Sequence, residues 1–318
     1  MSFSSRTKEE LVNDKLKKPC CRLAALSALV QMSGSLQLAG GGKKRLRLTT
    51  ESYAVARWAV QLAKSLYPLE TEILVRERKR LGKNRSFAIL LSGAAVEQVL
   101  FDTGLMRRTE EGYSIEGGVP EALVAEECCR RAFLRGAFMG GGSVSDPSKG
   151  YHLEFVVRSE RLACELCDAL NGYDLNAKVV LRKGSNVVYL KESEKITDFL
   201  TLIGAHGALL DLENVRIYKD FRNHLNRQVN CETANIFKTV SAATRQIENI
   251  QYLIAHEGFK TLSPALRETA EVRINHPDAT LSELGELLSE PIGKSGVNHR
   301  LRRLETIALE LKSEKGDV

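Results

Sequence analysis

The sequence predicts an α+β protein in which a pseudo-symmetric pair of αββαββα repeats is followed by an all-α helix-turn-helix domain. Three observations support this prediction. A helical phrase, CCRLAALSALVQMSGSL at 20–36, returns as CCRRAFLRGAFMGGGSV at 128–144, with seven of the seventeen positions identical. Short segments of alternating polarity follow each copy, as expected for strands with one buried face. From about residue 223 these strand signals stop, and capped helical segments follow.

The first repeat, at about 1–110, begins with a helix of small apolar residues. A hairpin around GGGKKR comes next, and its return strand covers 45–50. A helix over 51–67 precedes strands at 72–80 and 87–91, whose GKN turn is typical of hairpins. A short helix closes the repeat, and residues 112–120, with three glycines and a proline, are predicted as the connector.

The second repeat, at about 121–222, has the same order of elements. After its opening helix we expect a strand at 151–158, a helix at 159–170, and strands at 177–182 and 187–190 joined by KGSN. The matching order predicts that 1–222 forms one domain of two equivalent halves.

Residues 223–318 are predicted to form a separate helical domain. Ser263 and Pro264 supply an N-cap and a first-turn proline, and TLSE at 280–283 is a capping box that opens LSELGELL. Ser295 caps another helix that runs to Leu311. The connection at 289–294 is short, so the two helices form a helix-turn-helix at about 279–312, with Gly285 where they cross. The apolar face of the second helix is Val297, Leu301, Leu304, Ala308 and Leu311.

Basic residues gather in the first third of the chain. The net charge is +6, and residues 1–120 hold 20 Lys and Arg against 12 Asp and Glu. A basic surplus favours an anionic partner. The first residues are charged throughout, and no apolar run approaches the length of a membrane span. We therefore expect a cytoplasmic protein with no membrane partner.

The seven cysteines include two adjacent pairs, Cys20-Cys21 and Cys128-Cys129. An odd number with this spacing is unlike a secreted disulfide framework, so reduced thiols are expected. Neighbouring helical side chains diverge by about 100°, which makes each pair a poor chelate. A metal site built from both pairs is the disfavoured alternative. We expect these cysteines to act as small buried apolar residues, with no metal site.

The two αββαββα copies, each opened by a small-residue helix ending in Gly-Ser, resemble the single-chain LAGLIDADG homing endonucleases. Aligned on the final glycine, 26–34 and 134–142 take the nine signature positions. The resemblance implies that these helices pack through Ala25, Ala28, Gly136 and Gly140. At the eighth position the nucleases carry an acidic metal ligand, whereas this chain has Ser33 and Gly141. Divalent cations need oxygen ligands, usually carboxylates, so no catalytic residue is expected.

Three further marks resemble the WhiA family of bacterial regulators over essentially the whole chain: CCRRAFLRGAFMGGGSV, NRQVNCETAN at 226–235, and LSELGELL…GKSGVNHRLRRLE. The resemblance implies a non-enzymatic, sequence-specific regulator of transcription that binds double-stranded DNA. It also implies links to sporulation, cell division and chromosome segregation, and a place at the nucleoid. No cofactor or small-molecule substrate is expected. Two alternatives remain open: a protein-interaction platform tethered to DNA, which would bind the transcription machinery, and a metal-dependent DNA endonuclease.

The second helix of the helix-turn-helix carries the predicted DNA-reading residues. Donors near its start suit base edges, and cations farther along suit phosphates. The set is Lys294, Ser295, Asn298, His299, Arg300, Arg302 and Arg303. Two basic hairpins of the first repeat are further candidates for phosphate contacts, although edge strands also carry charge to avoid aggregation. Their residues are Lys43, Lys44, Arg45, Arg76, Arg78 and Arg80.

Overall fold

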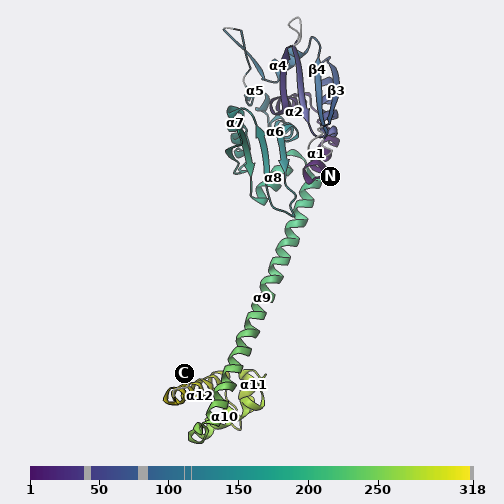
Figure 1. Ribbon diagram of the computed structural model, residues 1–318. Helices are drawn as coiled ribbons and strands as arrows, with labels where there is room; N and C mark the ends of the chain where they lie inside the picture. The colour runs from purple at the N-terminus through teal and green to yellow at the C-terminus, as the bar shows by residue number, and fades with distance from the viewer. Residues whose placement is uncertain (39–43, 78–84, 111, 116, 316–318) are drawn as a thin grey trace. The chain divides into compact units, whose positions relative to one another are not determined.

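The computed structural model describes residues 1–38, 44–77, 85–110, 112–115 and 117–315 (Figure 1). The chain divides into two units, Met1–Lys219 and a second that begins at Asp220. Each unit has its own apolar core. The predicted boundary at 222 falls inside a continuous helix, α9 (His206–Ala255), rather than at a break between helices.

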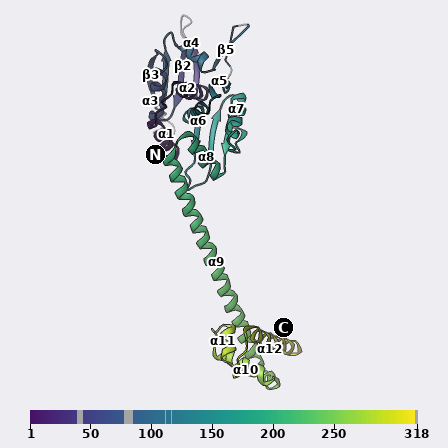
Figure 2. The ribbon, with the colours of Figure 1, turned by 180° about the vertical axis from the view of Figure 1, so that it is seen from behind.

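The first repeat has the predicted order of elements after a short N-terminal helix. Its elements are α1 (Phe3–Asn13), α2 (Pro19–Ser33), β1 (Gly34–Leu38), β2 (Lys44–Thr50), α3 (Tyr53–Lys64), β3 (Glu70–Glu77), β4 (Arg85–Ser92) and α4 (Val96–Asp102). The strands form an antiparallel sheet in the order β1-β2-β4-β3. Leu46 and Leu48 of β2 lie opposite Leu91 and Ile89 of β4, and all four are buried. This face of the sheet therefore packs on the helices (Figure 2).

Part of the predicted connector between the repeats is a β-hairpin. Strand β5 (Met106–Thr109) pairs with β6 (Gly112–Ile115), and Thr109 lies opposite Gly112. Gly112 takes a φ of +133°, which L-residues rarely adopt. The connector was predicted without these strands, because strands of four residues are too short to show a clear alternation.

The second repeat follows a short helix, α5 (Glu121–Val124). Its elements are α6 (Glu127–Gly141), β7 (Gly142–Val144), β8 (Leu153–Val157), α7 (Glu160–Asn171), β9 (Lys178–Arg182), β10 (Ser185–Leu190) and α8 (Ser193–Ile203). Its sheet order, β7-β8-β10-β9, matches that of the first sheet strand for strand. The pseudo-symmetric pair of αββαββα repeats is thus confirmed.

The opening helices of the repeats, α2 and α6, pack against each other at the centre of the first unit. A Cβ built on Gly136 would lie 2.2 Å from the carbonyl oxygen of Ala25, and one on Gly140 would lie 2.9 Å from the Cβ of Met32. The helices approach backbone to backbone, as predicted for these small residues. Successive contacts advance along both helices in the same direction, so α2 and α6 run parallel and begin at the same end.

Helix α1 is held against α6 by two cations. Arg135 is 4% exposed; its guanidinium pairs with the Asp14 carboxylate at 2.7 Å and donates to the carbonyl oxygens of Leu11 and Asp14. Lys8 Nζ donates to the carbonyl oxygen of Met139 at 3.3 Å. Burial lowers the pKa of Lys8 to about 8, because the charged ammonium loses its hydration.

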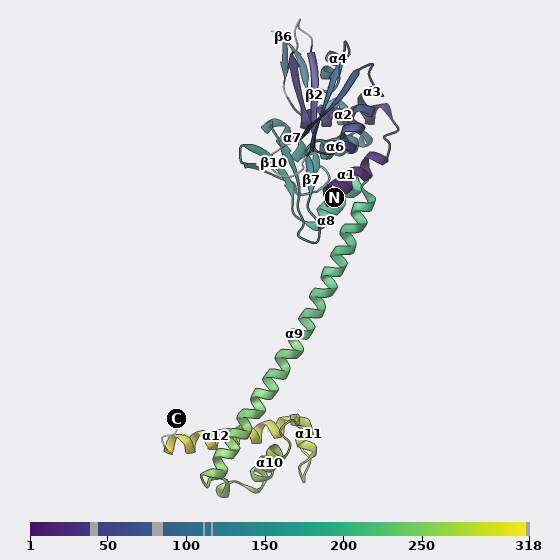
Figure 3. The ribbon, with the colours of Figure 1, turned by 45° about the vertical axis from the view of Figure 1, so that its right-hand side comes forward.

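The second unit is built from the later part of α9, α10 (Pro264–Asn275), α11 (Leu281–Glu286) and α12 (Lys294–Lys315), with a 3-10 helix at Gly258–Thr261 (Figure 3). Its core joins α9 to α12 through Ile250 and Leu253. The predicted apolar face of α12 lies in this core: Val297, Leu301, Leu304 and Ala308 are buried, and Leu311 is partly buried. None of the described helices is long and apolar enough to cross a membrane.

Candidate functional site

The helix-turn-helix of the second unit is fixed by local hydrogen bonds. The predicted capping box is present: the Glu283 N–H donates to Thr280 Oγ1 at 3.3 Å, and the Thr280 N–H donates to Glu283 Oε2 at 2.7 Å. The hydrogen bond from the Thr280 N–H holds the pKa of the Glu283 carboxyl below its ordinary value. Helix α11 therefore begins at a defined residue.

The turn between α11 and α12 packs directly on the α11 backbone. The Ile292 N–H donates to the Gly285 carbonyl at 3.2 Å, and a Cβ on Gly285 would lie only 2.1 Å from the Ile292 oxygen. The Glu268 carboxylate of α10 accepts the Ser289 N–H at 2.6 Å and fixes the other end of the turn. A glycine is therefore required at 285, where the sequence predicted the crossing.

The face of α12 opposite its buried residues is polar and exposed. Ser295 and His299 are exposed on the first two turns, and Arg302 and Arg303 are exposed one turn later. Lys294, the first residue of α12, is exposed as well. Five of the seven predicted residues of this helix are therefore exposed: Lys294 at its start, Ser295 and His299 next, and Arg302 and Arg303 after them.

Asn298 and Arg300 are partly buried. The Arg300 guanidinium donates to Thr269 Oγ1 of α10 at 3.4 Å, so the fold itself holds this side chain. Asn298 lines a cavity of about 350 Å³ with Lys294, Lys238 of α9 and Ser282 of α11. Sequence analysis did not select Lys238 or Ser282, because nothing in the local pattern indicates that α9 lies beside α11.

The basic residues of the first sheet divide between its two faces. In β2, Arg45 and Arg47 alternate with the buried Leu46, so they lie on the face away from the helices. The register of β3, β4 and β2 puts Arg76, opposite Ser86, on that same face. Arg45 and Arg76 are exposed and Arg47 is partly buried. The predicted residues Lys43, Arg78 and Arg80 lie outside the described residues.

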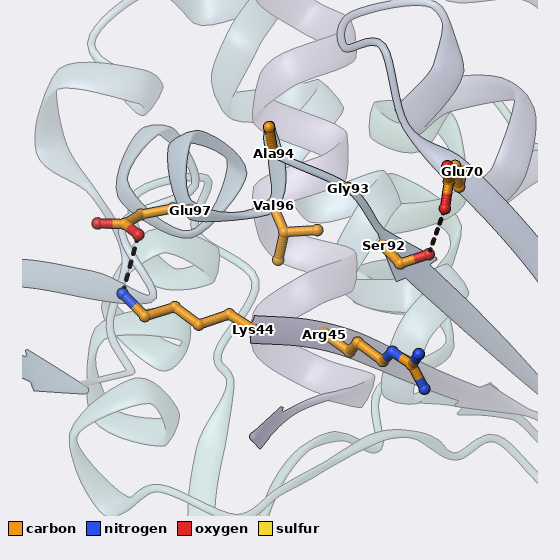
Figure 4. A pocket seen from close by; sticks show the side chains of 8 residues that line it. All are labelled: Lys44, Arg45, Glu70, Ser92, Gly93, Ala94, Val96 and Glu97. Atoms are coloured by element: carbon orange, nitrogen blue, oxygen red, sulfur yellow. Dashed lines mark hydrogen bonds and ion pairs between the residues drawn. The ribbon is translucent and has the colours of Figure 1, made fainter. Parts of the chain in front are cut away.

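The side chain of Lys44 lies on the same side of β2 as the buried Leu46, and it interacts with other residues of the first unit. Its Nζ lies 3.0 Å from Glu97 Oε2 of α4 and 5.0 Å from the centre of the Tyr113 ring. Figure 4 shows Lys44 directed at Glu97, while Arg45 extends along the other side of the same hollow. Of this basic hairpin, therefore, Arg45 is the described residue best placed to contact a partner.

The eighth signature positions carry no carboxylate. Ser33 is 8% exposed, and its hydroxyl donates to the Leu29 carbonyl of its own helix at 2.7 Å. At Gly141 a Cβ would lie 2.6 Å from the Met32 Cε and 3.1 Å from the Val156 oxygen. A larger side chain at 141 would have to displace Met32.

The two cysteine pairs, which are 108 residues apart in the sequence, meet in the structure. The Sγ atoms of Cys20, Cys21, Cys128 and Cys129 all lie within 4.8 Å of one another, where α2 and α6 begin. Cys21 and Cys129 are buried, Cys128 is partly buried and Cys20 is exposed. The sequence argument disfavoured a metal site built from both pairs because adjacent helical side chains diverge, but the parallel packing of the helices brings all four sulfurs together.

Comparisons with known proteins cover nearly the whole chain. Three family models match it: the WhiA N-terminal LAGLIDADG-like domain at 19–106, the WhiA LAGLIDADG-like domain at 130–222, and the WhiA C-terminal HTH domain at 225–308. They follow one another in the order of the two repeats and the helical second unit.

Curated relatives and a solved structure agree with these matches. Proteins described as "Probable cell division protein WhiA" from Alkaliphilus metalliredigens and Alkaliphilus oremlandii are 50% and 51% identical, over 97% and 99% of this chain and 98% and 99% of theirs. The crystal structure of full-length DUF199/WhiA from Thermatoga maritima is 26% identical with a TM-score of 0.61, and the match covers 98% of this chain and 99% of that one. The chain belongs to the WhiA family.

Proposed function

We propose that this protein is a non-enzymatic, sequence-specific DNA-binding regulator of transcription that acts in cell division, with further links to sporulation and chromosome segregation. Its relatives' descriptions name cell division. In this proposal the protein works in the cytoplasm at the nucleoid, on double-stranded DNA. The observation that carries it is the exposed polar face of α12, which belongs to a helix-turn-helix.

The order of residues on α12 suits a helix that enters the major groove. Ser295 and His299 offer donors and acceptors near the helix start, where base edges are read. Arg302 and Arg303 follow one turn later and suit phosphates, which position the helix without reading sequence. No acidic residue occurs between Pro291 and Leu304, so nothing on this stretch repels the DNA backbone. Asn298 and Arg300 support the surface from its edge.

The first sheet is a candidate second contact. Arg45, Arg47 and Arg76 share the face of the sheet opposite the buried Leu46 and Leu48, and the first third of the chain holds the basic surplus. Phosphate contacts of this kind add affinity and salt dependence but no base preference. Lys43, Arg78 and Arg80 belong to the same two hairpins and are part of this proposal.

The absence of carboxylates at positions 33 and 141 supports a role without catalysis. A metal-dependent nuclease needs acidic oxygens to hold its cations, and here one position donates to its own helix while the other has no side chain. Incubated with Mg²⁺ or Mn²⁺, the full chain should leave DNA containing its own binding site intact. Stoichiometric cleavage that EDTA abolishes would contradict this part of the proposal.

A second candidate function, a protein-interaction platform tethered to DNA, is favoured by the edge of the second sheet. Strand β9 is an edge strand, and its Val179, Val180 and Leu181 are all exposed, Leu181 by 71%. Exposed apolar residues on an unpaired edge suit a protein partner better than DNA. The transcription machinery is the partner class that this candidate implies.

The central experiment measures DNA binding of the full chain at several salt concentrations, on a site mapped in the parent organism. The double variant Arg302→Ala/Arg303→Ala should weaken binding to every sequence. The dependence of affinity on salt concentration should also become shallower, by the equivalent of roughly two phosphate contacts. Ser295→Ala should instead reduce the preference for the mapped site. Lys315→Ala, an exposed base in the last turn of α12, is the matched control. If the double variant and Ser295→Ala both bind like the wild type, α12 is not the reading helix.

A paired experiment separates the two candidate functions. Charge reversal at Arg45 and Arg76 should lower affinity and salt dependence, whereas reversal at Lys178 and Arg182 on β9 should change neither. Should the first pair have no effect at any salt concentration, the body of the protein makes no phosphate contact there, and the interaction platform becomes the better account of the repeats.

A further inference from the structure

The thiol cluster at the start of α2 and α6 has the geometry of a metal site. Four ligand atoms from residues 108 positions apart in the chain lie within 4.8 Å of one another, and the Cys128 and Cys129 sulfurs are 4.0 Å apart. A tetrahedral zinc–thiolate centre has Zn–S bonds of about 2.3 Å, which puts its sulfurs about 3.8 Å apart. The sulfurs therefore need to close by at most about 1 Å to surround one ion.

A packing role does not account for this arrangement. A cysteine that serves as a small apolar residue belongs in the core, as Cys167 does, with its thiol donating to the Ala177 carbonyl at 3.3 Å. In the cluster, Cys20 is exposed and Cys128 partly buried, yet both converge on the buried Cys21 and Cys129. Two accessible and two buried ligands form a site that is anchored in the core and open to an entering ion.

Burial raises the pKa of the Cys21 and Cys129 thiols, but two features of the surroundings favour the negative charge that bound thiolates would carry. The cysteines are the second and third residues of both helices, where the positive helix end stabilises a thiolate. Lys18 Nζ lies 4.0 Å from the Cys128 Sγ. The neighbouring Glu127 carboxylate is engaged elsewhere, because it accepts from the Tyr173 hydroxyl at 3.0 Å and lies 3.9 Å from the Arg130 guanidinium.

The four thiolate ligands and the distances between their sulfurs indicate which metal the site would bind. Four thiolates in a tetrahedron are typical of zinc or of an iron–sulfur cluster. A cluster places several irons and sulfides between the cysteines and holds their sulfurs farther apart than a single ion does. Sulfurs within 4.8 Å of one another leave room for one ion only. Zinc is the single ion that most often closes such a site in proteins.

We propose that Cys20, Cys21, Cys128 and Cys129 bind one structural Zn²⁺ that joins the two repeats. On binding, the four thiols release four protons and form four Zn–S bonds, and no atom changes its oxidation state. The ion links residues 108 positions apart and locks α2 to α6 at the end where both begin. The site occupies equivalent positions in the two repeats, each of which supplies half of it. This role does not depend on DNA binding.

The test is metal content and metal exchange in the full chain, purified with reduced thiols and without chelators. Elemental analysis should find about one zinc per chain. After removal of that zinc, Co²⁺ should produce the intense thiolate-to-cobalt absorption and the visible bands of tetrahedral coordination. Cys20→Ser and Cys128→Ser replace the accessible ligands and leave the core intact, and each should weaken metal binding by at least about 100-fold.

Cys164→Ser and Cys231→Ser are the matched controls, because both cysteines are exposed and lie outside the cluster. They should keep the full metal content and the cobalt spectrum. The fluorescence of Trp58, which is buried in the first unit, shows whether each variant is folded. A folded Cys20→Ser that binds metal like the controls would overturn the proposal.

Three results with the wild-type chain would also overturn it. One is a protein without zinc that gives no thiolate-to-cobalt absorption and keeps four freely reactive thiols in the cluster. Another is disulfide pairing of the four cysteines, detected by mass spectrometry under non-reducing conditions. The third is iron in place of zinc, which would keep the ligands but refute the assignment of the ion.

Discussion

Replacing Gly136 by alanine tests the close packing of α2 and α6 on which the fold of the repeats depends. The new Cβ would lie 2.2 Å from the Ala25 carbonyl oxygen and 2.9 Å from its carbonyl carbon and Cα. All three are backbone atoms in the middle of a buried helix, so none can rotate away. The two helices would have to separate locally by about 1 Å to reach an ordinary contact.

The expected cost follows from two opposing effects. Overpacking of a well-packed core costs about 1–3 kcal/mol, and a clash with backbone belongs at the upper end of that range. Alanine in place of glycine inside a helix stabilises the helix by about 1 kcal/mol. The free energy of unfolding of the first unit should therefore fall by about 2 kcal/mol, which moves a urea midpoint by about 1 M.

The assay is urea unfolding of the full chain followed by tryptophan fluorescence. Trp58 is the protein's single tryptophan and is 5% exposed in α3, so its emission reports on the first unit. Gly172→Ala is the control, because a Cβ there would lie 3.6 Å from its nearest neighbours. If Gly136→Ala unfolds at the same urea concentration as Gly172→Ala, the backbones of α2 and α6 do not approach as described.

Three other substitutions have defined outcomes. Gly285→Ala would bring a Cβ to 2.1 Å from the Ile292 oxygen, so hydrogen exchange should accelerate throughout the second unit while the Trp58 transition stays unchanged; unaltered exchange would contradict the packing of the turn. Thr280→Ala removes the N-cap of α11 and should cost about 1 kcal/mol, seen as faster exchange at the start of that helix alone. For Lys8, whose folded pKa of about 8 lies below the unfolded value of 10.5, the unfolded state binds the extra proton between these pH values. The wild type should therefore gain up to about 3 kcal/mol over Lys8→Met as pH rises from 8 to 10.5, and a constant difference would refute the burial of its ammonium.

Local patterns predicted most elements of both units. The period-two alternation of β2 and β4, the capping box at Thr280 and the apolar face of α12 are set by residues within a few positions of one another. The hairpin β5-β6 was not predicted because its strands are short. The sequence also did not predict that α9 is one continuous helix. The middle of α9 is exposed on all sides, so its sequence shows no apolar stripe. Hydrogen bonds between side chains one turn apart stabilise this part of the helix instead; for example, Gln228 Nε2 donates to Glu232 Oε1 at 3.1 Å.

The sequence by itself determined that the chain contains two copies of one repeat, that positions 33 and 141 lack carboxylates, and that α12 carries a basic face. Only the tertiary structure decided which of these residues meet. It turned Lys44 toward Glu97 and Arg300 toward Thr269, and it gathered Cys20 and Cys128 with their neighbours into one cluster. Contacts across 108 residues depend on how α2 and α6 pack. The small residues of these helices predicted a close approach, but the four sulfurs meet only because the two helices run parallel and begin at the same end.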